Sequence, residues 1–317
     1  MRLAGRALNI SRLRAGPTRH HDHVALSPAS WGISEIRGWG QQLESERVLH
    51  EIASLGESAI EAGPSGFLPD RSDAARGLLR RHGLRMVAGP VRAVLHHHDI
   101  RGAELAHIDG HAGWLAQLGA HTLVLTVIES REDGSDGVAL SSSGWAHLLS
   151  AVGSVKHVCT VHGLRLAVLP RRGSMIQGAS DIERLLVGSE AGVCLDLCQL
   201  VLAGADPVEM IELADGRIQH VHLNDLDGEI AGQVRERRID YATAVAGGLF
   251  KPLGHGDGKV TDVIEALQAA GYRGWYGLEA ERRLDSVEDD PLEEIRASIE
   301  FLRGRLPSPA KASKARA

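Results

Sequence analysis

Three side chains that can hold a metal ion or move a proton stand near the ends of apolar runs. Asp196 ends one run, His222 lies near the end of the next, and Glu279 ends the last. Short apolar runs of this kind are typical of buried parallel strands. Two carboxylates and one imidazole suit a divalent ion such as Mn²⁺, Mg²⁺ or Co²⁺, and they also serve as general acids and bases. These residues make one functional site if the fold brings the three strand ends together.

The segment between the first two of these runs predicts a helix. Asp206 can cap its N-terminus, Pro207 suits the first helical position, and Glu209 completes a capping box. Gly216 is a typical residue at a helix end. Strand, helix and strand have the size of one right-handed βαβ unit, and ligands bind at the carboxyl ends of parallel strands. The unit therefore delivers both functional side chains to a ligand-binding end.

The same alternation of apolar run and amphipathic segment continues along the chain. Strands are predicted at 23–27, before 61–64, and at 84–90, 122–127, 164–169, 192–199, 217–225 and 274–279. Helices are predicted at 42–56, 73–83, 102–119, 144–163 and 261–270, and from 180, 206 and 290 onward. This alternation predicts an α/β fold, a (β/α)8 TIM barrel, with one domain at 23–305. A doubly wound open sheet is the alternative, because it shares the local alternation. Residues 1–22 and 306–317 are predicted to be disordered basic tails.

The composition narrows the class of protein. A formal net charge of −6 argues against nucleic-acid binding through the phosphate backbone. Three cysteines are too few for a disulfide framework and are typical of the cytoplasm, where we place the protein. No apolar run approaches the roughly 18 residues of a membrane span, and no glycine-rich nucleotide-binding motif follows a strand. We therefore expect no membrane or nucleic-acid partner and no nucleotide cofactor, while a homo-oligomer remains open.

Further acid–base candidates lie near the same strand ends. Glu61 ends the second predicted strand and can touch a substrate hydroxyl or exchange a proton, and His255 is a second candidate. His220 faces the same side as His222 by the two-residue period of a strand, but it lies deeper. We therefore expect His220 to support the site rather than to contact the substrate.

Two other features are open to more than one interpretation. Cys194 and Cys198 are predicted to share the strand face of Asp196 as small buried side chains, with a thiolate ligand at Cys198 as the alternative. Residues 226–257 form a long, charged excursion after the seventh predicted strand. We predict a solvated helix there, with a lid over the ligand face as the alternative.

Six segments in a characteristic order occur at 27–32, 63–69, 194–196, 220–225, 252–257 and 271–279. Through them, about residues 24–303 resemble the xylose isomerase-like TIM-barrel superfamily, and within it the inosose dehydratases of inositol catabolism. The resemblance implies a divalent metal held by one ligand from each of the last four strands. Asp196, His222 and Glu279 match three of these ligands.

Four positions depart from the dehydratase pattern. Leu169 and Arg171 stand where such relatives have two histidines or a glutamate-bearing equivalent, Gln199 replaces a histidine, and Asn224 replaces a lysine. Leu169 cannot ligate an ion, and the charge of Arg171 would oppose one. We therefore expect metal binding to be weak or absent in the isolated protein. Departures confined to the site indicate a changed or lost activity on an unchanged fold.

Three functional hypotheses follow from these residues. The first is a sugar or cyclitol-ketone lyase, isomerase or epimerase that removes the proton next to a ketone of a small polyhydroxylated substrate and stabilises the enediolate. The second is a catalytically degenerate accessory or binding protein, and the third is a metal-independent enzyme in which Arg171 replaces the ion. The catalytic candidates are Glu61, His222, His255 and Glu279; the substrate-contact candidates are Trp31, Arg171, Gln199 and Asn224; the metal-ligand candidates are Asp196, His222 and Glu279.

Overall fold

The computed structural model describes residues 23–131 and 139–306. The predicted tails lie outside these residues, apart from Leu306, which directly follows the last helix. Eight parallel strands close into a barrel, so the predicted TIM barrel is confirmed. The barrel strands are β1 (Val24–Leu26), β2 (Ala59–Glu61), β3 (Arg85–Ala93), β4 (Thr122–Val127), β5 (Arg165–Val168), β6 (Gly192–Asp196), β7 (Ile218–Leu223) and β10 (Tyr276–Leu278).

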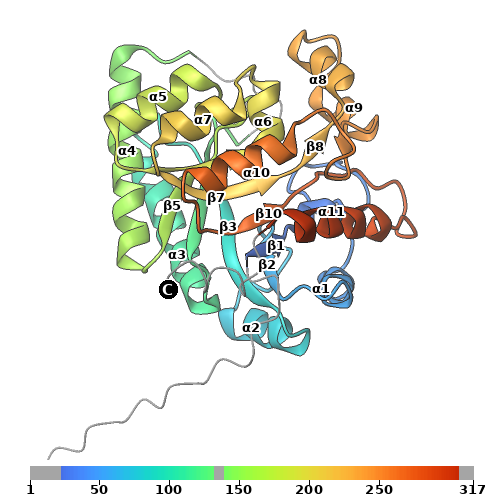
Figure 1. Ribbon diagram of the computed structural model, residues 1–317. Helices are drawn as coiled ribbons and strands as arrows, with labels where there is room; N and C mark the ends of the chain where they lie inside the picture. The colour runs from blue at the N-terminus through green and yellow to red at the C-terminus, as the bar shows by residue number, and fades with distance from the viewer. Residues whose placement is uncertain (1–22, 132–138, 307–317) are drawn as a thin grey trace, which may run out of the picture. The chain divides into compact units, whose positions relative to one another are not determined.

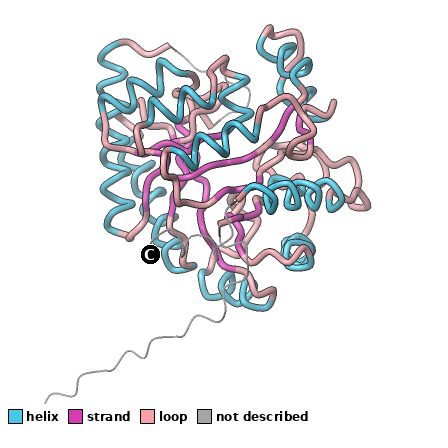
Figure 2. Tube along the Cα trace, in the orientation of Figure 1, coloured by secondary structure: helices cyan, strands magenta, loops and turns pink. Residues whose placement is uncertain are grey.

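Helices surround the barrel on the outside (Figures 1 and 2). They lie between successive strands and pack apolar faces against the sheet, which is the usual solution for a parallel sheet. They are α1 (Ser45–Ser54), α2 (Ser72–Arg81), α3 (Arg101–Leu118), α4 (Ser142–Val161), α5 (Ala179–Gly188), α6 (Leu197–Leu202), α7 (Pro207–Ala214), α10 (Val260–Ala269) and α11 (Leu292–Arg305), with a short 3-10 helix at Pro28–Trp31.

Strand pairing determines which side chains meet at the carboxyl ends. The barrel closes where β1 pairs with β10, and β10 pairs in turn with β7. In the register of these strands His222 lies opposite Asp196 on one side and opposite Gly277 on the other. Because side chains alternate along a strand, these residues share the inner face of the barrel. The fold therefore brings the predicted ligands of three strands together.

The inner face below these residues is filled by small apolar side chains. A separate buried cluster contains Ala25, Ala59, Ala88, Ala167 and Cys194, together with Val87, Val124 and Leu169. Small side chains suit the interior of an eight-stranded barrel, which has little room. These side chains therefore form an apolar layer in the barrel interior next to the polar site.

Local structure differs from the prediction at two helix starts. Strand β6 ends at Asp196, and helix α6 includes residues that were predicted to extend the strand. Cys198 therefore does not share a strand face with Asp196, and that prediction is wrong. The Asp196 carboxylate instead caps α6 by accepting the backbone N–H of Gln199 at 3.0 Å. Helix α5 follows Gly178 at its N-cap, so the capping box predicted from residue 180 is also wrong.

The cap of α7 is confirmed. The Asp206 carboxylate accepts the backbone N–H groups of Val208 and Glu209 at 2.8 and 3.3 Å. Asp215, in a left-handed conformation, ends the helix one residue before Gly216. The βαβ unit that carries Asp196 and His222 is thus formed by local signals present in the sequence.

The excursion after β7 contains β8 (Asp225–Leu226), α8 (Gly228–Arg235), α9 (Tyr241–Ala246) and β9 (Phe250–Lys251). The buried carboxylate of Asp225 accepts four backbone N–H groups, those of Leu226, Gly254, Gly256 and Gly258, at 2.8–3.0 Å. A Cβ atom at Gly256 or Gly258 would lie 2.5 or 2.8 Å from Asp225 Oδ1, so only glycine allows this approach. One carboxylate therefore ties both ends of the excursion to the end of β7.

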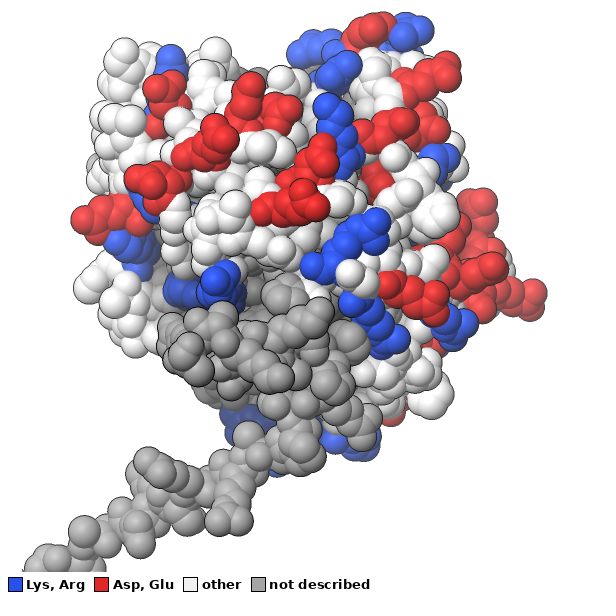
Figure 3. All heavy atoms as spheres, viewed as in Figure 1, with Lys and Arg blue, Asp and Glu red and all other residues white. Residues whose placement is uncertain are grey.

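On the face shown in Figure 3, Lys and Arg side chains are interspersed with Asp and Glu side chains. Among the described residues, helices long and apolar enough to cross a membrane are absent.

Candidate metal and proton-transfer site

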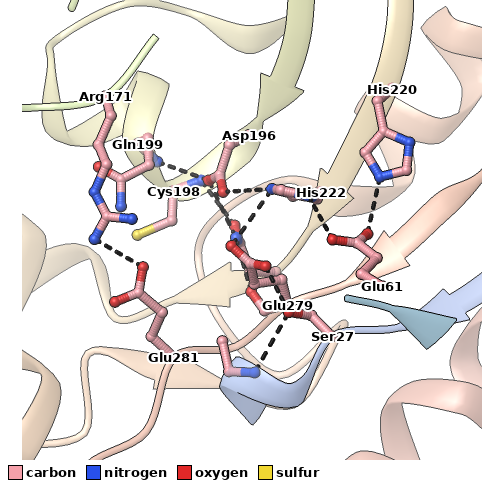
Figure 4. Close-up of polar contacts among 12 residues, drawn as sticks. Ser27, Glu61, Arg171, Asp196, Cys198, Gln199, His220, His222, Glu279 and Glu281 are labelled. Atoms are coloured by element: carbon pink, nitrogen blue, oxygen red, sulfur yellow. Dashed lines mark hydrogen bonds and ion pairs between the residues drawn. The ribbon is translucent and has the colours of Figure 1, made fainter. Parts of the chain in front are cut away.

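The three predicted metal ligands meet at the carboxyl end of the barrel (Figure 4). His222 Nδ1 lies 3.5 Å from Asp196 Oδ2 and 3.4 Å from Glu279 Oε1. One ligand atom from each residue lies within 4.8 Å of the other two. All three side chains are buried or nearly so, with 4% of the Asp196 and His222 side chains and 14% of the Glu279 side chain exposed. The prediction that the fold gathers these residues agrees with this geometry.

Glu61 fixes the orientation of the His222 ring. Its two carboxylate oxygens contact His220 Nε2 at 2.8 Å and His222 Nε2 at 3.1 Å. Burial opposes the charge on Glu61, but the two imidazoles keep its pKa below the ordinary value. An ionised carboxylate accepts N–H groups, so both histidines donate from Nε2. His222 Nδ1 is then left facing Asp196 and Glu279.

His222 Nδ1 fits a metal ion. It is a buried atom without a hydrogen-bond partner among the described residues. Its separations of 3.4 and 3.5 Å from two carboxylate oxygens are close to those of ligands around one ion at about 2.0–2.2 Å. A second group, Glu61 with His220 and His222, is equally compact, but its short contacts are hydrogen bonds. The ion site therefore lies on the Nδ1 side of His222.

The ionisable groups around His222 Nδ1 also favour a positive charge at this site. Burial raises the pKa of Glu279 to about 7, and nearby carboxylates add to this rise. Burial opposes the charge on His222, but its acidic neighbours Cys194, Glu279 and Glu61 raise its pKa well above the ordinary value. Several acidic groups thus share one buried space, and positive charge there is favourable.

Two neutral side chains hold the carboxylates in place. Asn224 donates from Nδ2 to Asp196 Oδ1 at 3.1 Å and to the Glu279 carbonyl oxygen at 3.0 Å, and its own side-chain oxygen accepts the Cys198 N–H at 2.7 Å. Ser27 donates its hydroxyl to Glu279 Oε2 at 2.6 Å. Asn224 therefore takes part in the support of the ligands, on the buried side of the site.

A cavity of about 660 Å³ opens above these residues. Arg171 forms an ion pair with Glu281 at 2.9 Å, and its guanidinium lies 5.5 Å from the centre of the Tyr241 ring. Gln199 donates from Nε2 to the Tyr241 hydroxyl at 3.2 Å. Leu169 lines the cavity, together with polar side chains, those of Glu61, Arg171, Gln199, His222, Tyr241, Glu279 and Glu281. The cavity thus has acidic side chains at its base, and its wall contains the Arg171–Glu281 ion pair and the Tyr241 hydroxyl.

Arg171 lies in the cavity, as the sequence predicts, but its charge is partly offset. Glu281 supplies an ion-pair partner, and the pKa of Arg171 is raised because Glu281 and Tyr241 outweigh the effect of burial. Neither Glu281 nor Tyr241 is among the site residues predicted from the sequence. Glu281 follows Glu279 by two residues, so it shares a face with that residue in an extended segment, which is a usable signal. Tyr241 reaches the cavity only through the folding of the excursion, for which the sequence has no comparable signal.

Three predicted catalytic or substrate-contact residues do not line the cavity: Asn224, which supports the ligands from the buried side, and Trp31 and His255. Trp31 is fully buried, and its indole N–H donates to Glu51 at 2.7 Å, away from the residues that line the cavity. His255 is exposed in the loop tied to Asp225 and does not line the cavity described above. Cys198 is buried in α6, and burial raises the pKa of its thiol well above the ordinary value, which favours the neutral form.

Comparison with known proteins agrees with this arrangement. The family model described as a xylose isomerase-like TIM barrel matches residues 49–305. The rhizopine catabolism protein MocC of Rhizobium meliloti is 27% identical over 267 residues, which cover 82% of this chain and 81% of MocC. The inosose dehydratase of Geobacillus kaustophilus is 25% identical over 270 residues, which cover 82% of this chain and 87% of that enzyme.

Solved structures show the same fold at lower identity. The crystal structure of D-psicose 3-epimerase in the presence of D-fructose has a TM-score of 0.67 at 15% identity, covering 90% of this chain and 99% of that one. The structure of the IOLI protein with a zinc atom has a TM-score of 0.65 at 13% identity, covering 88% and 96%. An epimerase and a protein that binds a zinc atom therefore share this architecture.

Proposed function

The chain belongs to the xylose isomerase-like TIM barrel family, and from this premise and the site geometry we propose that it is an enzyme that removes the proton next to a ketone of a small sugar or cyclitol. The resulting enediolate is then either reprotonated, as in an isomerase or epimerase, or expels a β-hydroxyl group, as in a lyase. In the second case the hydroxyl group takes up a proton from the protonated base and leaves as water. Elimination is favoured by the inosose dehydratase relative at 25% identity.

The observation that carries the proposal is the unpaired His222 Nδ1 between two carboxylates at the floor of an open cavity. Asp196, His222 and Glu279 would hold a divalent ion there, and the ion would supply an electrophile for the ketone oxygen. The zinc atom in the structure of the IOLI protein, which has the same fold, supports a metal in this chain.

The residues of the chain divide the remaining work. Glu279 reaches the cavity with a carboxylate that the Ser27 hydroxyl orients, so it is placed to take the proton. Glu61 lines the cavity and orients His222, and its carboxylate can also accept a hydrogen bond from a substrate hydroxyl. On the opposite wall, Arg171 can donate to oxygens on which negative charge develops, and Gln199 can donate to neutral hydroxyls.

We expect the ion to bind weakly. Leu169 brings an apolar side chain to the cavity at the position where the family pattern has a fourth ligand, and only Asp196, His222 and Glu279 remain. The ion pair between Arg171 and Glu281 reduces, but does not remove, the repulsion that Arg171 exerts on a cation. Mn²⁺, Mg²⁺ or Co²⁺ is the expected ion, because two of the three ligands are carboxylates.

Solvent exchange tests the proposal directly. In ²H₂O with added Mn²⁺ or Co²⁺, the purified protein should replace the proton next to the ketone of an inosose or a ketose with deuterium. NMR detects this exchange as loss of the proton signal. Glu279→Gln and His222→Ala should each lower the exchange rate by about a hundredfold or more. Gly153→Ala, at an open position on α4, is the matched control and should exchange at the wild-type rate. Unchanged exchange in both site variants would contradict the assignment.

A binding or accessory protein is the second candidate, favoured by Leu169 in place of a ligand. A protein that binds polyols but catalyses no exchange across inososes and ketoses would support it. For either function we propose a cytoplasmic protein without nucleic-acid partners, consistent with three free, buried cysteines. Homo-oligomerisation is a matter for light scattering.

A further inference from the structure

A second cavity, of about 340 Å³, lies between the loop after β2 and one face of α3. We call it the α3 groove. Five residues line both this groove and the main cavity, namely Gly63, Pro64, Ser65, His107 and His111. The two spaces are therefore neighbours with a common wall. A ligand whose reacting part lies over His222 can extend along this wall into the groove.

Three rings on α3 form one side of the groove. His107, His111 and Trp114 recur with helical spacing and line it together. The rings of His111 and Trp114 are stacked, with centroids 5.5 Å apart and planes inclined by 19°. Aromatic faces carry partial negative charge, and the C–H bonds of a sugar or cyclitol ring carry the opposite partial charge. The wall therefore suits a flat polyol ring.

The groove is open because two positions lack side chains. Gly110 on α3 and Gly66 in the facing loop both line it, and a Cβ atom built at either residue meets nothing within 4 Å. Gly110 lies inside a regular helix without a positive φ, so its helical conformation does not require glycine. Any larger side chain at Gly110 would occupy the groove.

Two residues that line the groove, His111 and Trp114, each have a ring nitrogen without a partner among the described residues. His111 bonds to the Pro90 carbonyl, so one of its nitrogens carries the proton, while the other, Nε2, is left as an acceptor. Trp114 Nε1 is a donor. Both are buried atoms without a hydrogen-bond partner among the described residues. Leaving such groups unpaired is costly, but both atoms are enclosed by protein, so neither contacts a ligand in the groove in this conformation.

We propose that the α3 groove binds a second polyol ring, linked to the unit that reacts over His222. The substrate is then a glycoside-like compound rather than a single sugar or cyclitol. The aromatic wall packs against the face of the second ring, and Ser65 and Asp70 offer polar contacts for its hydroxyls. The carboxylate of Asp70 disfavours an anionic group at this place. This inference rests on the proposed function for the identity of the reacting unit.

Binding of unreactive sugars tests the groove separately from catalysis. Wild-type protein is titrated with methyl β-D-glucopyranoside and with the disaccharide cellobiose, followed by NMR or calorimetry. We expect cellobiose to bind about tenfold more tightly, which corresponds to one or two additional hydrogen bonds. Gly110→Leu should remove this difference. Gly102→Leu, at an equally open position of the same helix that does not line the groove, should retain it.

Each outcome decides a different point. Equal affinity of the wild-type protein for both sugars, or a preference for cellobiose that survives in Gly110→Leu, would overturn the groove assignment. A preference that Gly110→Leu abolishes, in a protein that exchanges no proton with any ketone, would retain the groove and reject the proposed enzyme. Circular dichroism of both leucine variants shows whether α3 is intact, and replacing a helical glycine should not destabilise it.

Discussion

Gly277 is the position at which one methyl group should disrupt the site. It lies on β10, opposite His222 in the strand register. A Cβ atom there would lie 2.1 Å from Glu61 Oε1 and 3.1 Å from His222 Cδ2. Gly277 has no positive φ, so alanine is compatible with its backbone conformation. The effect of Gly277→Ala should therefore arise from displacement of the Glu61 carboxylate.

The expected cost follows from the contacts of Glu61. Displacement lengthens its hydrogen bonds to His220 and His222, now 2.8 and 3.1 Å, in a place where Glu61 is only 3% exposed and water cannot replace them. Breaking a buried charged pair costs about 3–5 kcal/mol. For a domain of this size that lowers the melting temperature by roughly 6–10 °C. His222 also loses the partner that orients it, so affinity for Co²⁺ should fall.

Calorimetry and Co²⁺ titration of purified Gly277→Ala measure both effects. Gly153→Ala is the control, because a Cβ atom there meets nothing within 4 Å and alanine favours the helix by up to about 1 kcal/mol. If the free energy of unfolding of Gly277→Ala lies within about 1 kcal/mol of the wild-type value and Co²⁺ binds equally well, Glu61 does not hold His222 as described.

Four other variants test the metal-ligand candidates, the cavity wall and the anchor of the excursion. Glu279→Gln removes one charged ligand, and its Co²⁺ affinity in equilibrium dialysis should fall by about tenfold or more; unchanged binding would contradict the ligand assignment. Leu169→Glu should raise the affinity by a similar factor and Leu169→Gln by less, because only glutamate adds a charge; equal affinities in both would show that the position lies beyond reach of the ion. Asp225→Asn leaves one acceptor oxygen where four N–H groups converge, and should destabilise the protein by about 2–3 kcal/mol. Hydrogen exchange should then rise within 226–258, whereas a rise spread evenly over the barrel would refute a local role.

The barrel follows from signals that lie close together in the sequence. Apolar runs such as Thr122–Val127 predict a buried strand directly, and the Asp206 cap predicts the start of α7. Because strand order in a barrel follows chain order, the meeting of Asp196, His222 and Glu279 can also be predicted.

The wrong and missing predictions have two sources: a local helix cap that competes with an apolar run, and a contact between segments far apart in the sequence. The apolar segment after Asp196 has no residue that breaks a strand, yet the Asp196 carboxylate starts a helix there and turns Cys198 away from the strand face. Tyr241 meets Arg171 only because the excursion folds back over the barrel mouth. Contacts between segments far apart in sequence leave no periodic trace in either segment.

The single carboxylate of Asp225 has a consequence for how this chain tolerates change. The backbone at the start of the excursion and the backbone at its end both donate hydrogen bonds to Asp225, three residues after His222. The segment between them contributes Tyr241 to the cavity, but it carries none of the three metal-ligand candidates. Substitutions at the cavity-facing positions of that segment should therefore change the cavity wall and leave the three metal-ligand candidates in place, whereas its buried side chains, such as Val245 and Leu249, belong to the main hydrophobic core.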